Sequence, residues 1–176
     1  MHPRLEALFA DLEIHRAGLV AAVETVPPAL RHERPLPDRW CVAEILDHLA
    51  ISEHRVARIL IKKISEGRAA GLAAEEESSP IPASRRIALV RERQQRVMAP
   101  DGIAPRRDVK IDDAWAELGR SREALRAAAL TGDGLALATL SYPHPLAGVL
   151  NLYQWIAFVG AHEARHAAQI REIAGV

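Results

Sequence analysis

Hydrophobic residues recur every three or four positions over most of the chain, which is the pattern of amphipathic helices. The first such stretch covers residues 5–23, with Pro3 suited to its first turn and two prolines at 27 and 28 as its stop. A longer apolar stripe covers residues 42–64, and Asp38 precedes it as the expected N-cap. The first half of the chain therefore predicts two long helices.

Two further helices are predicted in the second half of the chain. Asp112 or Asp113 is the expected N-cap of one that ends before the glycine at 132. The last helix is expected over residues 149–174. Both carry one apolar and one polar face, so each should bury only one side.

The segments between these helices have weaker signals. Residues 67–83 are rich in Gly, Pro, Ser and Glu, which predicts a mobile loop. A shorter helix is expected at about 84–98, and residues 135–147, with two prolines, should be extended. We therefore predict an all-α fold, a four-helix bundle in one domain spanning residues 1–176. The short helix would lie in the long connection between bundle helices 2 and 3. Connections this long permit a crossover, so the order of the helices stays open.

Composition excludes several classes of protein. The chain has 176 residues with 23 basic and 23 acidic side chains, and this zero net charge argues against nucleic acid as a partner. One cysteine, Cys41, cannot form an intramolecular disulfide. No run of about 18 apolar residues is present, and the charged N-terminal segment does not resemble a signal peptide. We therefore expect a cytoplasmic protein without a membrane partner.

The sharpest local motif is His162-Glu163-Ala164-Arg165-His166 in the last predicted helix. Histidines at i and i+4 project from one helical face, so both imidazoles can reach one metal ion. Trp155 and Gln169 share this face, and we predict that they line the pocket or support the ligands. The alternative is a histidine pair that is simply hydrogen-bonded within a partly buried core.

The same five residues fit the HExxH pattern of zinc peptidases, in which the glutamate is the general base. Such enzymes generally have a third ligand downstream, whereas only ten residues follow His166 here. A peptidase is therefore disfavoured. Glu163 is retained as a candidate catalytic base, with an ion pair to a neighbouring helix as the alternative role.

His48 is the best candidate for a third ligand. It lies on the apolar face of the second predicted helix, where a lone histidine can also be an ordinary core residue. Glu44 and Ser52 lie four residues on either side, and we predict that one of them holds the second ring nitrogen of His48.

Three separated motifs together resemble the DinB-like superfamily of small metalloproteins. They are WCVAEILDHL at 40–49, HPLAGVL at 144–150, and the Trp155…HEARHAAQI segment ending at 170. The resemblance spans most of the chain in the right order. It implies a four-helix bundle that binds a divalent metal, zinc or nickel, through His48, His162 and His166.

The resemblance also implies a class of chemistry. Several similar proteins are transferases or isomerases that use low-molecular-weight thiols such as mycothiol or bacillithiol, and some are homodimers. Three histidine ligands leave a coordination position open, as in catalytic zinc sites. We therefore expect a metal-dependent thiol S-transferase or related hydrolase with a small-molecule substrate. The alternative is a non-catalytic binding or stress-response protein that the metal only stabilises.

Overall fold

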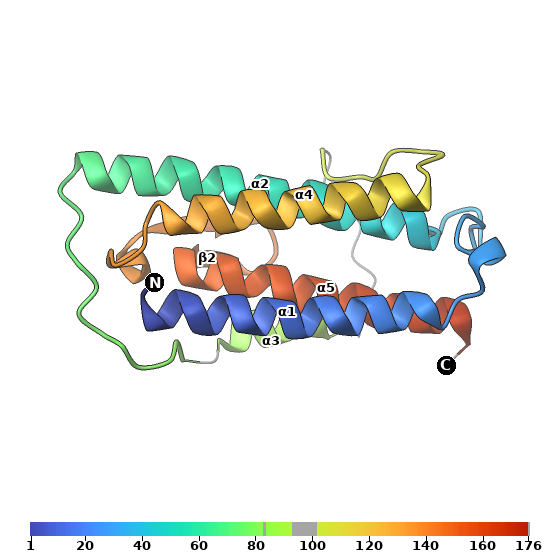
Figure 1. The fold of residues 1–176 in the computed structure, drawn as a ribbon, viewed down its shortest axis with the longest axis horizontal. Helices are drawn as coiled ribbons and strands as arrows, with labels where there is room; N and C mark the ends of the chain where they lie inside the picture. Colours follow the sequence, from blue (N-terminus) through green and yellow to red (C-terminus); the bar gives the residue numbers. More distant parts are fainter. Residues whose placement is uncertain (83, 93–101, 176) are drawn as a thin grey trace.

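The computed structural model describes residues 1–82, 84–92 and 102–175. Within these residues, four long helices lie side by side and a small hairpin packs on one flank (Figure 1). This arrangement confirms the predicted all-α four-helix bundle. The long helices are α1 (Pro3–Glu24), α2 (Val42–Ala69), α4 (Ile111–Leu130) and α5 (Leu152–Ala174).

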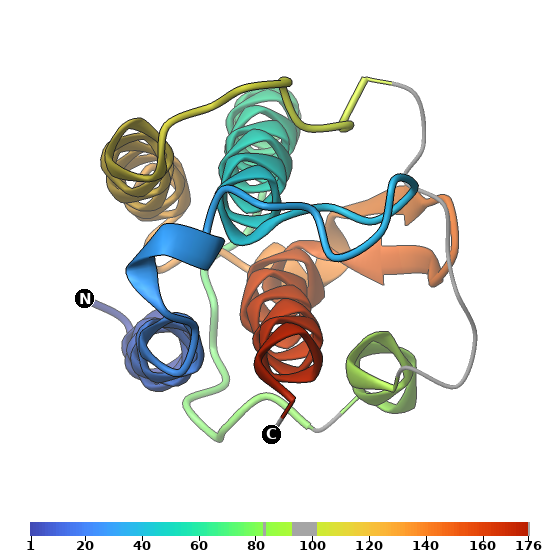
Figure 2. The ribbon, with the colours of Figure 1, turned by 90° about the vertical axis from the view of Figure 1, so that its right-hand side faces the viewer.

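The helices follow a crossover order, which the sequence had left open. Along the chain, α1 and α5 run in one direction and α2 and α4 in the other (Figure 1). Seen end-on, α2 and α4 form one pair and α1 and α5 the other (Figure 2). Because α2 and α4 are parallel, the connection between them must return along the bundle, and it carries α3 (Arg85–Arg91) against α5.

Two predicted N-caps are wrong. Helix α2 has Cys41 as its N-cap, because the Cys41 backbone N–H donates to the Glu44 carboxylate in a capping box. Asp38 therefore lies outside the helix. Helix α4 has Lys110 as its N-cap and no side-chain cap bond, so Asp112 and Asp113 fall inside the first turn. Their negative charges still favour this end of the helix dipole.

The short helix in the long connection exists but is shorter than predicted. Helix α3 ends at Arg91, and Glu92 already has an extended backbone. Residues 93–98 of the predicted helix lie outside the described residues. The preceding segment is a loop as expected, although α2 continues to Ala69, and Arg4 ties this loop to α1 through Glu75 and Glu77.

The segment before the last helix forms a hairpin. Strands β1 (Ser141–His144) and β2 (Gly148–Asn151) pair antiparallel, which confirms an extended segment in part. A short 3-10 turn over Leu137–Thr139 precedes them. The residues at 149–151 belong to β2, so α5 begins at Leu152 rather than at 149, with Asn151 and Gln154 in a capping box.

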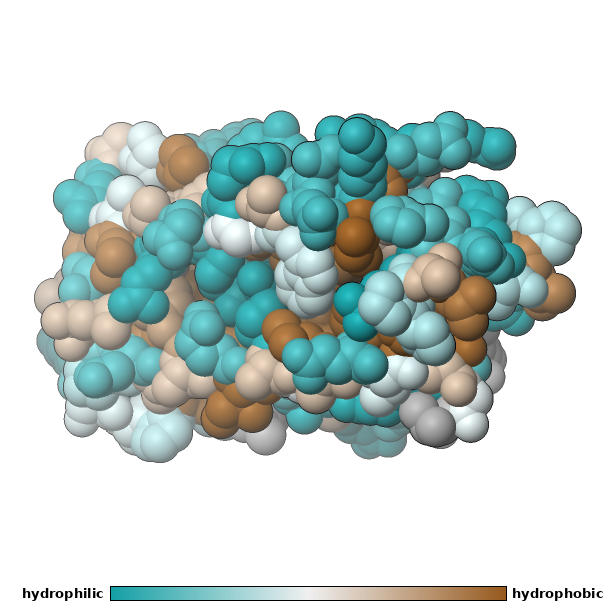
Figure 3. All heavy atoms as spheres, turned by 45° about the vertical axis from the view of Figure 1, so that its right-hand side comes forward, coloured by the Kyte–Doolittle hydropathy of each residue, from teal (hydrophilic) through white to brown (hydrophobic). Residues whose placement is uncertain are grey.

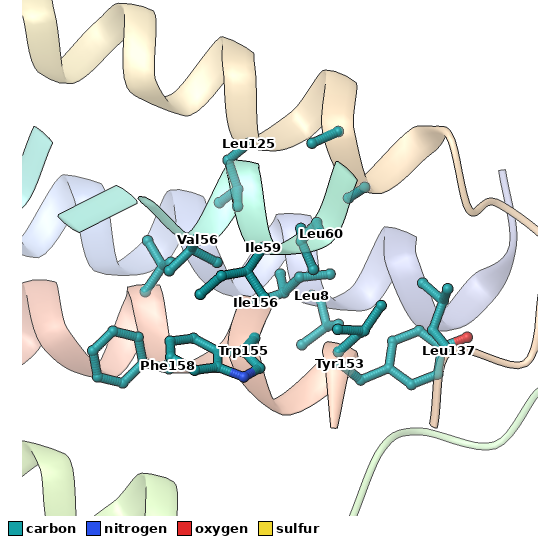
Figure 4. Packing of buried hydrophobic residues seen from close by; sticks show 14 of the residues in the cluster. Leu8, Val56, Ile59, Leu60, Leu125, Leu137, Tyr153, Trp155, Ile156 and Phe158 are labelled. Atoms are coloured by element: carbon teal, nitrogen blue, oxygen red, sulfur yellow. The ribbon is translucent and has the colours of Figure 1, made fainter. Parts of the chain in front are cut away.

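Two clusters of buried apolar side chains fill the bundle. In the larger one, Leu8, Leu60, Leu125 and Ile156 of the four long helices point toward one another (Figure 4). On the face that Figure 3 shows, hydrophilic residues predominate and hydrophobic patches are small and separate. Among the described residues, none of the helices is both long enough and apolar enough to cross a membrane.

Candidate metal centre

A layer of buried polar residues separates the two apolar clusters. On each long helix it occupies the positions between the segments that contribute to the two clusters. The buried polar side chains of this layer on α2, α4 and α5 are Ser52, Glu53, Ser121, Arg122, Glu163 and His166. Burying polar groups costs free energy unless they find partners, so each one requires an explanation.

A cluster of three imidazoles adjoins this layer, with His162 and His166 from α5 and His48 from α2, one turn before Ser52. The Nε2 atom of His162 lies 3.2 Å from Nε2 of His48 and 3.1 Å from Nε2 of His166. His48 and His166 are 3% and 6% exposed, so the cluster is largely shielded from solvent. The structure therefore brings together the three histidines that were predicted as metal ligands.

Hydrogen bonds on the far side of two rings determine where their protons are. Nδ1 of His48 lies 2.6 Å from the backbone oxygen of Ile103, which can only accept, so this nitrogen carries the proton. Nδ1 of His166 lies 2.9 Å from Oε1 of Gln169 and donates to it in the same way. Both rings, when neutral, thus direct an Nε2 lone pair at His162.

Two converging lone pairs facing a third imidazole are a poor arrangement by themselves, because the Nε2 proton of His162 can satisfy only one of them. Nitrogen ligands about 2.0–2.1 Å from a tetrahedral zinc ion lie about 3.3 Å from one another. The two separations in the cluster are close to that value. The donor set therefore fits a divalent cation of the kind that imidazole binds.

Burial favours the neutral form of His48 and His162, which is the form that binds metal. Desolvation lowers the pKa of His48, against the opposing effects of the Ile103 carbonyl and Asp47. The pKa of His162 lies well below its usual range because of burial, with smaller contributions from His166 and His48. No proton has to be displaced from the Nε2 atoms of His48 and His166 for a cation to bind.

Aromatic rings enclose the cluster. The Trp40 ring lies 4.7 Å from the His48 ring, and the Phe158 ring stacks on His162 at 5.2 Å, both between centroids. Trp155 contacts Phe158 at 5.6 Å and donates its ring N–H to the Tyr142 carbonyl. Trp155 is thus one ring removed from the three clustered histidines, and Phe158 and Trp40, which were not among the predicted pocket residues, form the apolar walls.

The predicted partner of His48 is wrong. Glu44 accepts hydrogen bonds from Arg34 and from the Cys41 backbone, and Ser52 Oγ is buried without a hydrogen-bond partner among the described residues. The backbone of Ile103 takes the place predicted for one of these side chains. A backbone carbonyl can come from any residue type, so no sequence signal could have identified it. Gln169 does contact His166, one of the predicted ligands.

Glu163 lies in the polar layer itself. Its Oε1 accepts from Arg16 Nε at 2.8 Å and from Arg122 Nη2 at 3.0 Å, and the side chain is 1% exposed. Burial raises its pKa even though both arginines act in the opposite direction. This position matches the alternative role of an ion pair with neighbouring helices, here α1 and α4. A catalytic role for Glu163 stays a prediction.

Glu53 completes this charged network. It accepts from Arg122 Nε at 2.6 Å, from Ser121 at 2.7 Å and from Arg16 at 3.3 Å. A narrow recess joins the network to the histidine cluster. Its lining residues are Leu49, Ser52, Glu53, Phe158, Val159, His162 and Glu163.

The comparisons with known proteins agree with this geometry. The family model of the DinB superfamily matches residues 11–170. The chain belongs to the DinB superfamily. Its proteins are metal-associated, and the three histidines of this member lie where they could hold such an ion.

A relative in Bacillus subtilis (strain 168) is described as "Uncharacterized protein YuaE". It is 27% identical over 150 residues, covering 81% of this chain and 82% of the relative. No solved structure matches the chain. The comparisons thus establish the family without assigning a reaction.

Proposed function

We propose that this protein is a divalent-metal-dependent enzyme whose cation is held by His48, His162 and His166. The observation that supports this proposal best is the pair of lone pairs that Ile103 and Gln169 direct onto His162. Hydrogen-bond partners of this kind orient histidine ligands and raise their basicity. Zinc and nickel are the ions we expect.

The reaction class in this proposal is transfer of a low-molecular-weight thiol, or a related hydrolysis. When bound, a divalent cation lowers the pKa of a water or thiol near it and so supplies a nucleophile at neutral pH. Three protein ligands leave a position for such a group. In the transfer reaction the thiol would release its proton and its sulfur would form a bond to an electrophilic carbon of the second substrate. The bond from that carbon to its leaving group would break at the same time, and the leaving group would depart with the electron pair and take up a proton.

The residues around the histidines have separate tasks in this proposal. Trp40 and Phe158 exclude water from two sides of the cluster. Ile103 and Gln169 keep the protons of His48 and His166 on Nδ1. Glu163, engaged by two arginines, is not required as a base, which also argues against the peptidase alternative.

Metal analysis of untagged protein is the first test. We expect about one divalent ion per chain in the purified protein and none in the His166→Ala variant. The loaded protein is then screened with cysteine, glutathione, mycothiol and bacillithiol against a panel of electrophiles. Absence of metal from the wild-type protein after zinc or nickel addition would refute the proposal.

The alternative is a metal that only stabilises the bundle. It predicts that chelation lowers the melting temperature while no thiol binds near the ion. Cobalt substitution separates the two cases, because a thiol that binds Co²⁺ changes its visible spectrum. Size-exclusion chromatography of the same samples tests the expected homodimer.

A further inference from the structure

The residue before His48 holds the loop that contacts His48. Asp47 is fully buried on α2, and its two oxygens accept from one residue, Arg106. Oδ1 accepts from Arg106 Nε at 3.0 Å and from Nη2 at 2.5 Å, and Oδ2 accepts from the Arg106 backbone N–H at 2.8 Å. Asp47 thus fixes both the side chain and the backbone of Arg106.

Arg106 lies three residues after Ile103, whose carbonyl accepts from His48 Nδ1. Two consecutive residues of α2 therefore hold the same short loop segment, Asp47 at one point and His48 at the other. The Arg106 side chain is 64% exposed, so burial of apolar surface does not explain its position. The hydrogen bonds with Asp47 explain the position of this side chain.

We propose that the Asp47–Arg106 pair is a positioning device for the metal ligand His48. By fixing the loop, it keeps the Ile103 carbonyl on Nδ1 of His48, and so reserves the Nε2 lone pair for the cation. The metal-affinity part of this inference rests on the proposed function, whereas the effect on the His48 hydrogen bond holds in metal-free protein.

The chemistry of the pair suits this task. Arginine presents a planar fork of donors that fixes direction as well as distance, whereas lysine is a point charge. Here the fork meets one carboxylate oxygen, and the backbone N–H meets the other. Without the clamp, the loop gains freedom at Ile103, and the proton of His48 is free to move to Nε2.

The first test uses nuclear magnetic resonance on metal-free protein with ¹⁵N-labelled histidine. In the wild type we expect a His48 Nδ1 proton that exchanges slowly with water, assigned by its loss in His48→Gln. In Arg106→Gln we expect exchange at least about tenfold faster and a mixture of His48 tautomers. Arg107→Gln, which removes the same charge from the next residue, should leave the signal unchanged.

A second variant separates positioning from general stability. Arg106→Lys keeps the charge without the fork, and we expect it to leave His48 as mobile as Arg106→Gln does. If Arg106→Gln does not fold, Asp47→Asn tests the same contact with nearly the same volume. A His48 signal that is absent from the wild type, or is unchanged in Arg106→Gln, overturns the proposal.

Zinc affinity, measured by competition with a chromogenic chelator, gives the second readout. Loss of a partner of a metal ligand typically weakens binding about 10- to 100-fold, and we expect about tenfold for Arg106→Gln and no change for Arg107→Gln. Equal affinity of the wild type and Arg106→Gln overturns the positioning role but leaves the proposed function intact. A wild type that shows the His48 effect but binds no metal supports the clamp and refutes the proposed function.

Discussion

The polar layer of this bundle and the histidines that adjoin it form two halves that follow different rules. In the half made by Arg16, Glu53, Arg122 and Glu163, opposite charges from all four long helices pair directly. In the half made by the three histidines, the Nε2 lone pairs of His48 and His166 both point at Nε2 of His162. The halves meet at neighbouring residues, since His162 and Glu163 adjoin on α5.

The difference separates a structural cluster from a functional one. The charges of the first half pair within the protein, although Oε2 of Glu163 is buried without a hydrogen-bond partner among the described residues. The net contribution of such buried pairs to stability is often small. The single Nε2 proton of His162 can be donated to only one of two facing lone pairs, whereas one cation can bind all three nitrogens. We therefore expect damage to the first half to unfold the protein, and damage to the second to abolish metal binding with little loss of fold.

The largest expected effect comes from breaking the charged half. Arg122→Met leaves Glu53 and Glu163 with one cationic partner, Arg16, in the interior. Removing one member of a buried pair typically costs about 3–5 kcal/mol, and we expect a loss of that size in the free energy of unfolding measured with urea. Arg120→Met, which removes an exposed ion pair with Glu117, should cost less than about 1 kcal/mol. Equal losses in the two variants would contradict the comparison.

Breaking the histidine half should have a different signature. Zinc at a hundred times its dissociation constant stabilises the wild type by about 2.7 kcal/mol, and His166→Ala should lose this gain. Without zinc, the variant should unfold close to the wild type. The control is His54→Ala, which removes a histidine that contacts Glu117 instead. Thermal unfolding with and without zinc measures both quantities, and a zinc shift that survives in His166→Ala would be inconsistent with the site.

The pH dependence of the free energy of unfolding should also distinguish the two halves. Burial puts the pKa of His162 well below its usual range and lowers that of His48, so below pH about 6.5 the unfolded chain binds more protons at these residues. Their contribution to stability is therefore complete above this pH and is lost as the pH falls, by at most about 1.4 kcal/mol per pH unit and residue. Urea unfolding of metal-free His162→Gln between pH 7.5 and 5.5 should show a shallower decline than the wild type.

Glu163 acts in the opposite direction, because burial raises its pKa and folding then favours its protonated form. Glu163 is present in both proteins, so the difference between their slopes reports on His162. Parallel slopes would mean that His162 does not remain neutral in the folded protein.

A matched pair of serines sharpens the comparison further. Ser121 donates to Glu53 at 2.7 Å, whereas Ser52 Oγ has no hydrogen-bond partner in the part of the chain that the structure describes. Ser121→Ala should cost about 1.5–3 kcal/mol, since its acceptor is charged, and Ser52→Ala should be neutral within about 0.5 kcal/mol. Urea unfolding of the two variants side by side checks this, and the reverse order would show that the recess is not organised as described.

Local pattern accounts for most of what could be predicted. The apolar stripes placed the four long helices, and the i, i+4 spacing placed His162 and His166 on one face. Helix ends were less predictable, since Asp38 was expected as the N-cap and the capping box of Cys41 with Glu44 instead makes Cys41 the N-cap. The ion pairs of Glu163 were also not predictable from local pattern, because its partners Arg122 and Arg16 lie 41 and 147 residues away along the chain.

The sequence by itself determined the helical periodicity, the histidine pair on the last helix and the candidacy of His48, because these depend on spacing within single helices. Only the tertiary structure decided that α2 runs parallel to α4, that Ile103 rather than Glu44 holds His48, and that Glu163 faces two arginines. Those outcomes depend on which distant segments pack together. The local sequence around one residue of such a contact does not identify its distant partner.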